Sequence, residues 1–465
     1  MANAPAATTP SSGALRSLES HVTRLCRPGS ADSPGSSPQI PGAVFLASTP
    51  TQPCAYSATS PSFAAGTTSL HTPLSHPLSP SSTFWTASCS KLLTSLAAVH
   101  VVEIRRLWDW DRPVVEVLPE LKAIRVLEGW DEKRGPIWRG ESGNGEGKGV
   151  EQVTLRHLLT HTSGMAYDFL SADILKWWKW RGRKREDFSG RLLEMYGEAP
   201  MLTGAGEAWM YSPGIDLAGL LVARVAGVER LGVYVWEEVL KKVGVKEGDV
   251  VFRKGDLKWG EEEVRERWVY LSVRTQEGLV HLPTAPADTA RDDLGGGGVR
   301  CPPRAYIKVL ESLLRNDGRI LPPKIVDELV FSPQLVDGPG KLGAHLGRSL
   351  MKVFGELEGS RMLTGGLPVP VKDEAGQYGG EYEFNHSLVA ALSRRKGSKE
   401  WTLYWGGLPN LFWWVDRKEE VAGIQAMQLL PPADEVCLDL AVEFREAAIE
   451  ALGKGAARGK EQARI

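Results

Sequence analysis

The chain has 465 residues, enough for a large hydrophobic core and one to three domains. Its formal net charge of −2 argues against general nucleic-acid binding, and no apolar run of about 18 residues predicts a membrane span. Five scattered cysteines are typical of free thiols in a reducing, cytoplasmic setting and have no metal-ligand spacing. We therefore expect a globular protein without a bound metal or other cofactor.

The N-terminal part predicts a helix followed by strands. Residues 1–12 are small and polar, which predicts disorder, and they lack the basic and apolar segments of a secretory signal. Residues 40–47 are apolar throughout and predict a strand buried on both faces, whereas residues 55–65 give a weak strand signal. Residues 14–25 predict an amphipathic helix, because apolar side chains recur at helical spacing: Leu15, Leu18, Val22 and Leu25.

The first chemical signal is the pair Ser88 and Lys91, which stands directly before an apolar run, residues 92–102. That run is apolar on nearly every side, so it predicts a buried helix. Ser88 would lie in the first turn, where unpaired N–H groups favour negative charge, with Lys91 on the same face. A serine nucleophile needs a base, and a lysine kept from water can lose its proton and act as one.

This Ser-x-x-Lys pattern has a second interpretation. Ser88 can equally be a helix N-cap, with Lys91 extending along the surface to water. The pattern also occurs again at residues 393–396, where no apolar helix follows, and we interpret that copy as a solvated loop. The four residues alone therefore leave catalysis and helix capping about equally favoured.

The glycine-rich run at residues 134–150 is interpreted as a connector. Lys148 is followed by Gly149 rather than Ser or Thr, which argues against a phosphate-binding loop. His157 and His161 are four residues apart and could share one helix face. No glutamate follows His157, so a structural role, with imidazoles bonded to the backbone, is favoured over metal binding.

Residues 174–185 combine aromatic and basic side chains. They predict either a helix end whose indoles pack while its cations stay in water, or a docking surface for an acidic partner or a rim of the substrate mouth. Further on, residues 217–226 predict an apolar helix that ends at Gly227, and residues 292–299 predict a tight glycine-rich turn. Two more helices are predicted, at residues 305–314 and 324–330.

The C-terminal part predicts an antiparallel meander of three strands, at residues 401–405, 411–416 and 421–429. A final helix is predicted at residues 435–452, followed by a disordered basic tail, residues 453–465. The two ends of the chain would then form one sheet, with the helical middle as an insertion.

The predicted fold class is therefore α+β: an antiparallel sheet flanked by N- and C-terminal helices, with a large, mostly helical insertion. We expect one catalytic domain, residues 13–452. Its sheet part would comprise about residues 13–85 and 340–452, and its helical part about residues 86–339.

Three separated segments resemble the serine β-lactamase-related superfamily: FWTASCSKLLTSLAAVHVVE, TLRHLLTHTSGM and WMYSPGIDLAGLLVARVAG. Within it they are most similar to class C-like esterases and to fungal acyltransferases of the lovastatin transesterase type. The segments IPGAVFLA, LGGGG and YWGGLPNLFWWVD fit the same family, so the resemblance extends over roughly residues 38–432. It implies a β-lactamase/transpeptidase-like fold.

The resemblance also implies a site. Ser88 matches the acylated serine of the family, Lys91 its lysine, and Tyr211 the tyrosine that shares proton transfer with that lysine. The oxyanion hole would use the backbone N–H groups of Ser88 and Leu408. A phenol is a weak base at neutral pH, but a neighbouring ammonium stabilises the phenolate, so the lysine and the tyrosine would work as a pair.

Two departures from the family pattern bear on the substrate. Trp405, Gly406 and Gly407 stand where β-lactamases carry the substrate-binding Lys-Thr-Gly, and an indole cannot pair with a lactam carboxylate. Pro213 stands where the family often has Asn, so no amide can orient a substrate there. Trp405 is also compatible with simple packing on a strand. Both departures favour ester chemistry on a bulkier, less charged acyl compound.

We therefore predict a serine acyl-enzyme hydrolase or acyltransferase that acts on esters or thioesters, in the setting of secondary metabolism. The partners would be a small-molecule acyl donor and acceptor, with an acyl-carrier domain as a candidate donor. Hydrolysis and acyl transfer both stay open. The alternative is a non-catalytic binding or assembly protein that retains the fold, and no Gly-x-Ser-x-Gly supports an α/β-hydrolase.

Overall fold

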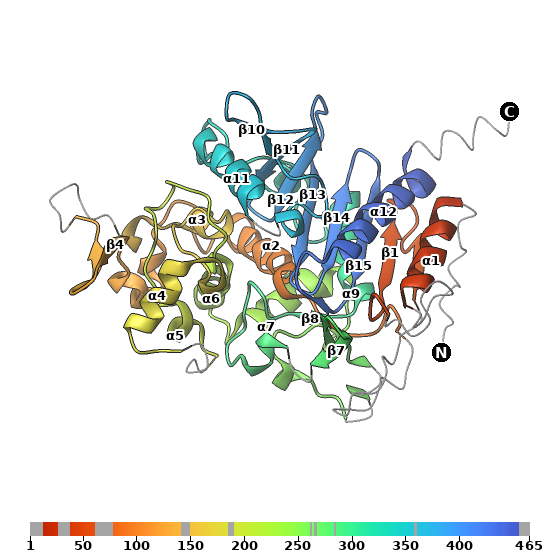
Figure 1. Cartoon of the computed structure of the whole chain (residues 1–465), viewed down its shortest axis with the longest axis horizontal. Coiled ribbons are helices and arrows are strands. Elements are labelled where there is room, and N and C mark those ends of the chain that lie inside the picture. Colours follow the sequence, from red (N-terminus) through yellow and green to blue (C-terminus); the bar gives the residue numbers. More distant parts are fainter. Residues whose placement is uncertain are drawn as a thin grey trace.

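The two ends of the chain meet in one antiparallel sheet, as the apolar segments near each end predicted (Figure 1). In the computed structural model of the chain, β1 pairs with β15, and Val44 lies opposite Ala426. The sheet has seven strands in the order β11-β12-β13-β14-β15-β1-β2, and they span Tyr382–His386, Ala391–Arg395, Thr402–Gly407, Leu411–Asp416, Val421–Ala426, Val44–Ser48 and Tyr56–Thr59.

The structure describes residues 13–26, 38–60, 78–140, 149–184, 190–260, 263–264, 267–282, 285–357 and 360–454. The two segments predicted to be disordered lie outside these ranges, apart from Gly453 and Lys454. Within the ranges, no helix has both the length and the apolar character needed to cross a bilayer, and no cluster of His, Cys, Asp or Glu could hold a metal ion.

Several helices match the predicted segments, and the last one matches its predicted bounds, whereas the helices at residues 192–196, 231–235 and 344–356 were not predicted individually. They are α1 (Gly13–Cys26), α2 (Ser90–Glu103), α3 (Leu155–Leu159), α4 (Ala172–Trp180), α5 (Leu192–Tyr196), α6 (Gly214–Ala226), α7 (Leu231–Val235), α9 (Pro303–Arg315), α10 (Pro323–Ile325), α11 (Ala344–Glu356) and α12 (Glu435–Leu452).

Helices cover both faces of the large sheet. Successive side chains of a strand point to opposite faces, and two neighbouring indoles of β14 show this. Trp413 contacts Tyr306 of α9, with ring centres 6.3 Å apart, whereas Trp414 contacts Phe444 of α12 at 5.0 Å. α1 packs beside α12. The fold is therefore α+β, with N- and C-terminal helices against the sheet.

The chain between β2 and β11 forms the mostly helical part, which is centred on α2. Every residue of α2 from Ser90 to Val102 is buried, and α6 packs along it. This part also holds short strands that the sequence pattern did not predict: β3 (Phe84–Trp85), β4 (Leu127–Asp131), β5 (Gly135–Trp138), β6 (Leu271–Thr275), β7 (Gly278–Leu282), β8 (Arg300–Cys301), β9 (Val371–Lys372) and β10 (Tyr378–Gly379). One of them, β6, pairs with β16 (Leu429–Leu430), which follows β15.

Two expectations from the sequence are wrong. The second Ser-x-x-Lys copy is not a solvated loop, because Ser393 is 1% exposed and lies in β12, between Phe384 and Thr402 of the neighbouring strands. His157 and His161 do not share a helix face, because α3 ends at Leu159 and His161 has a φ of 60°. At Ser393 the neighbouring strands, rather than the local pattern, decide the conformation.

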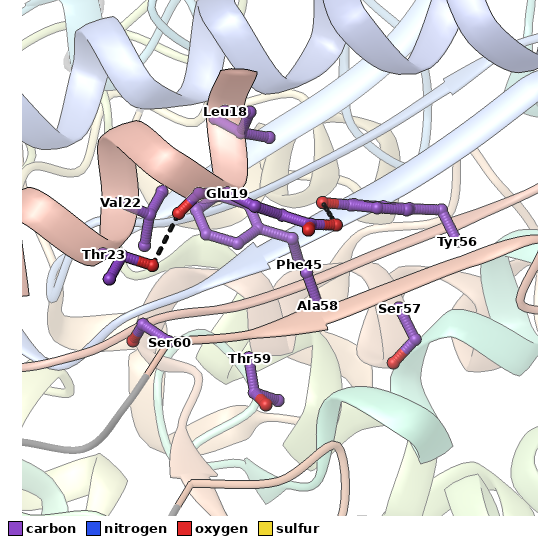
Figure 2. Close-up of a pocket in the computed structure, with 10 residues that line it drawn as sticks. All are labelled: Leu18, Glu19, Val22, Thr23, Phe45, Tyr56, Ser57, Ala58, Thr59 and Ser60. Carbon is purple, nitrogen blue, oxygen red and sulfur yellow. Dashed lines mark hydrogen bonds between the residues drawn. The ribbon is translucent and has the colours of Figure 1, made fainter. Parts of the chain in front are cut away.

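Figure 2 shows a cavity of about 260 Å³ between α1 and the strands β1 and β2, at the edge of the sheet. The Tyr56 hydroxyl donates to the Glu19 carboxylate at 3.0 Å, and the Thr23 hydroxyl donates to the Glu19 carbonyl at 2.7 Å. The first of these bonds joins β2 to α1 and helps hold the helix against the sheet, whereas the second lies within α1. None of the residues that line this cavity contributes to the site described next.

Candidate active site

Ser88 lies in a single 3-10 turn, Ala87–Cys89, between β3 and α2. Ala87 has a φ of 44°, a left-handed conformation that is uncommon for a residue with a side chain, so the chain turns sharply here. The Ser90 hydroxyl donates to the Ala87 carbonyl at 2.6 Å and accepts the Val299 N–H at 2.9 Å. These bonds fix the turn that places Ser88 at the start of a buried helix.

Two polar side chains reach the Ser88 hydroxyl. The Tyr211 hydroxyl donates to Ser88 Oγ at 2.7 Å, and Lys91 Nζ lies 3.5 Å from the same oxygen. Lys91 Nζ also lies 4.8 Å from the centre of the Tyr211 ring. The structure thus brings together the three side chains singled out in the sequence, although Tyr211 lies 123 residues after Ser88.

Lys91 has two further partners. Its Nζ donates to the Gly296 carbonyl at 2.7 Å and to the Tyr167 hydroxyl at 3.1 Å. The side chain is buried, and the three acceptors match the three N–H donors of an ammonium group. Lys91 is therefore held in one position between Ser88 and the glycine-rich turn.

A buried carboxylate, Asp216, completes this network. Its Oδ1 accepts the Gly296 N–H at 2.8 Å, and its Oδ2 accepts the Tyr167 hydroxyl at 3.3 Å. Burial raises the pKa of Asp216, while the charge of Lys91 and these hydrogen bonds oppose the rise. Burial, together with the Asp216 charge, raises the pKa of Tyr167 well above its usual value, so that phenol keeps its proton and donates it.

The glycine-rich turn was predicted as a tight turn, and the structure shows why its residues are glycines. A Cβ on Gly296 would lie 2.5 Å from Asp216 Oδ2, and a Cβ on Gly295 would lie 2.9 Å from the Ile215 carbonyl oxygen. Both distances are too short for real contacts. The turn therefore needs glycine because it presses against α6.

The end of β13 lies against the Ser88 turn. A Cβ on Gly407 would lie 2.5 Å from the Thr86 carbonyl oxygen, so only glycine permits this approach. Leu408 follows, and its side chain packs on a small cluster that includes Ala87, the residue before Ser88. The Ser88 N–H lies in the first helical turn, where N–H groups have no intrahelical acceptor. The end of β13 therefore lies directly against the turn that carries Ser88.

Trp405 of β13 lies behind Tyr211. The centre of its indole ring lies 5.7 Å from the centre of the Tyr211 ring. The indole also stacks on the His161 ring, with ring centres 6.0 Å apart and an angle of 19° between the ring planes. His161 Nδ1 accepts the Ser212 N–H at 3.3 Å, which matches the predicted structural role of this imidazole. Burial lowers the pKa of His161 well below its usual value, so the ring is neutral.

Sequence reasoning missed Tyr167 and Asp216 as members of the site. Asp216 carried one signal, a single acidic residue in the otherwise apolar first turns of α6. Tyr167 carried none, because nothing in its neighbourhood distinguishes it from any other tyrosine. Only the fold shows that Tyr167 bonds Lys91 and that Asp216 bonds the partners of Lys91.

The chain is similar to known proteins along most of its length. A family model described as Beta-lactamase matches residues 31–447. Monacolin J acid methylbutanoyltransferase of Aspergillus terreus is 32% identical over 375 residues, which cover 78% of this chain and 80% of that protein. Lovastatin esterase of Penicillium rubens is 30% identical over 374 residues, which cover 77% and 83%.

Solved structures agree with these relatives. Unliganded simvastatin synthase from Aspergillus terreus superposes with a TM-score of 0.74 at 27% identity, covering 96% of this chain and all of that one. EstCE1, a hydrolase with promiscuous acyltransferase activity, has a TM-score of 0.64 at 17% identity, covering 94% and 98%. The second likeness concerns the fold alone.

Proposed function

The chain belongs to the β-lactamase family and is a serine acyltransferase or esterase, and on that premise we propose that Ser88 forms its covalent acyl-enzyme. The observation that carries this proposal is the meeting of Tyr211 and Lys91 at one serine hydroxyl, at 2.7 and 3.5 Å. A serine becomes a nucleophile when a base can take its proton, and this arrangement provides one. A non-catalytic binding role is therefore set aside.

In the proposed reaction, Ser88 Oγ attacks the carbonyl carbon of an ester or thioester, and its proton moves to Tyr211. The Lys91 ammonium, 4.8 Å from the Tyr211 ring centre, stabilises the phenolate that accepts this proton. The backbone N–H groups of Ser88 and Leu408 stabilise the oxyanion. The tetrahedral intermediate then expels the alcohol or thiol, which takes the proton from Tyr211.

Deacylation reverses these steps. Tyr211 removes a proton from the acceptor, the acceptor oxygen attacks the acyl carbon, and Ser88 Oγ leaves with the proton. A small-molecule alcohol as acceptor gives acyl transfer, and water gives hydrolysis. We propose a short branched acyl group, because one relative is named a methylbutanoyltransferase.

We expect the protein to prefer esters and thioesters over β-lactams. A charge-assisted hydrogen bond to a carboxylate contributes about 1.5–3 kcal/mol, or roughly tenfold to a hundredfold in kcat/KM. Trp405 stands in place of the lysine that would make this bond, and Gly406 and Gly407 complete the triplet without a polar side chain. Trp405 is 2% exposed and packs behind Tyr211, so this side of the site offers no cation to a substrate carboxylate.

The test compares nitrocefin with short-chain p-nitrophenyl esters and acyl thioesters on one preparation, with Ser88→Ala as the blank for every substrate. We expect kcat/KM to be highest for the esters or thioesters. A nitrocefin kcat/KM above those of both other classes would overturn the substrate assignment.

We further propose that the acyl donor is a thioester on an acyl-carrier domain with an acidic docking face. The support is a mainly basic and apolar face beside the site, formed by the exposed side chains of Phe169, Leu170, Leu175, Lys176, Lys179 and Trp180. One acidic residue, Asp173, is also exposed on α4, and it accepts a hydrogen bond from the Trp130 indole at 3.0 Å. This face begins at the site itself, because the Phe169 ring stacks on Tyr167 with centres 4.9 Å apart, and Tyr167 bonds Lys91. Cations next to apolar groups complement an acidic protein surface.

Charge reversal tests this partner. Lys179→Glu should lower kcat/KM for an acyl group carried on an acyl-carrier domain and leave the rate with the same acyl group on a short soluble thiol unchanged, because only the carrier touches α4. The control is Lys352→Glu on α11, also an exposed helical lysine, which lies away from α4 (Figure 1). Equal effects of both variants, or equal use of both donors by the parent protein, would contradict a carrier docked on this face.

A further inference from the structure

Asp216 takes no direct part in the reaction proposed above, yet it bonds both of the groups that hold Lys91. The first route runs through the Gly296 peptide, whose N–H donates to Asp216 at 2.8 Å and whose carbonyl accepts from Lys91 at 2.7 Å. The second runs through the Tyr167 hydroxyl, which donates to Asp216 at 3.3 Å and accepts from Lys91 at 3.1 Å. One carboxylate therefore bonds every hydrogen-bond partner of Lys91 except Ser88.

We infer that Asp216 is a positioning residue that aims Lys91 at Ser88 and Tyr211 and, as its counter-charge, keeps Lys91 in the ammonium form. Under this assignment Tyr211, and not Lys91, accepts the Ser88 proton. The inference rests on the proposed role of Ser88 and deepens it, because it decides which member of the pair is the base.

Burial makes a structural role alone a poor account of this carboxylate. Asp216 is 3% exposed, and its neighbours in α6, Ile215 and Leu217, are buried apolar residues. A buried charge is retained only where it is paired and hydrogen-bonded, and Lys91 is the cation that its network reaches. A neutral residue would fill the same place at a lower desolvation cost, so we assign the charge to the site.

Other titratable groups surround this network, and one of them is Tyr196, whose ring centre lies 6.3 Å from that of Tyr167. Tyr167 faces Asp216 from the segment before α4, and its pKa is raised, so it stays neutral. Tyr211 faces Lys91 from the segment before α6. His161, behind Tyr211, is neutral because burial lowers its pKa. Asp216 is thus the one carboxylate among the described residues that bonds the partners of Lys91.

The experiment is the pH dependence of kcat/KM for a p-nitrophenyl ester in Asp216→Asn. Asparagine can still accept the Gly296 N–H but carries no charge. A negative charge makes neighbouring groups hold their protons more tightly. Its removal should therefore move both limbs of the pH profile, the rise of kcat/KM on the acid side and its fall on the alkaline side, to lower pH by about one unit. Asp216→Glu, which restores the charge, should return both limbs toward their original positions even if its kcat is lower.

The matched control is Asp293→Asn. Asp293 is also a buried carboxylate at the glycine-rich turn, but it accepts the Gly232 N–H at 2.7 Å and pairs with Arg230 and Arg253, at 3.4 Å each. We expect Asp293→Asn to lower the thermal stability and to leave both limbs of the kcat/KM pH profile at the pH values of the parent protein. If Asp216→Asn does not fold, Asp216→Ser removes the same charge and carries the same expectation.

An unchanged profile in folded Asp216→Asn, or equal shifts in the Asp216 and Asp293 variants, would overturn the inference. Failure of the proposed function gives a different result, because the parent protein would then carry no acyl group on Ser88 at any pH. An acylated parent protein with an unmoved profile in Asp216→Asn rejects the role of Asp216 alone.

Discussion

Ser88→Ala is expected to lose ester and thioester turnover by on the order of 10⁴–10⁶ in kcat, the size found when a nucleophile that works with a base is removed. The hydroxyl is the only group in the network placed to form a covalent bond with an acyl carbon, since Tyr211 and Lys91 both converge on it. The fold should persist, because the turn is fixed by the Ser90 hydroxyl and not by Ser88. Steady-state kinetics and circular dichroism measure both expectations.

The chain contains its own control for this substitution. Ser393 begins a second Ser-x-x-Lys sequence but lies within β12, where its buried hydroxyl has no hydrogen-bond partner among the described residues. Ser393→Ala should therefore retain full activity. A large loss in Ser393→Ala, or retention of more than about a tenth of the activity in Ser88→Ala, would contradict the assignment of the nucleophile.

Lys91→Ala and Tyr211→Phe are each expected to lower kcat by on the order of 10²–10⁴, the usual contribution of general acid–base catalysis. The double variant should be little worse than either single variant, because the two groups move one proton as a unit. The structural reason is that both side chains reach one oxygen, with Lys91 Nζ 4.8 Å from the Tyr211 ring centre. A double-mutant cycle on an aryl ester measures the coupling.

Tyr404→Phe is the matched control for Tyr211→Phe. Tyr404 is also a buried tyrosine, but its hydroxyl has no hydrogen-bond partner in the described part of the chain. Its loss should leave kcat unchanged. Losses that multiply in the Lys91/Tyr211 double variant would mean that the two residues act independently, and the proton-transfer pair would have to be abandoned.

Most of the sheet and the three residues that we propose as catalytic could be predicted from the sequence, for identifiable reasons. β13, β14 and α12 are long, strongly patterned segments, and local pattern is reliable in such elements. Ser88 and Lys91 stand one helical turn apart, so a single segment encodes their relation. Tyr211 required the resemblance to a family, because no local rule connects it to a serine 123 residues earlier.

The remaining features depend on contacts between distant segments. β12 contains Arg394 and Arg395 next to Ser393, and only its neighbours Phe384 and Thr402 make this polar stretch a strand. Such pairing can override the local preference of a sequence. Asp216 and Lys91 are connected by hydrogen bonds to the N–H and the carbonyl of Gly296. A hydrogen bond to the backbone cannot be predicted from the pattern of side chains in a sequence.

The most direct test of the central claim is intact-mass measurement of the protein during turnover of a methylbutanoyl thioester, followed by peptide mapping. We expect one added acyl group, on the peptide that contains Ser88, and none in Ser88→Ala. The neighbouring Cys89 should stay unmodified, because burial raises the pKa of its thiol well above the usual value and leaves little thiolate. Turnover without an adduct, or an adduct on Cys89, Ser393 or another residue, would contradict the assignment of Ser88 as the acylated nucleophile.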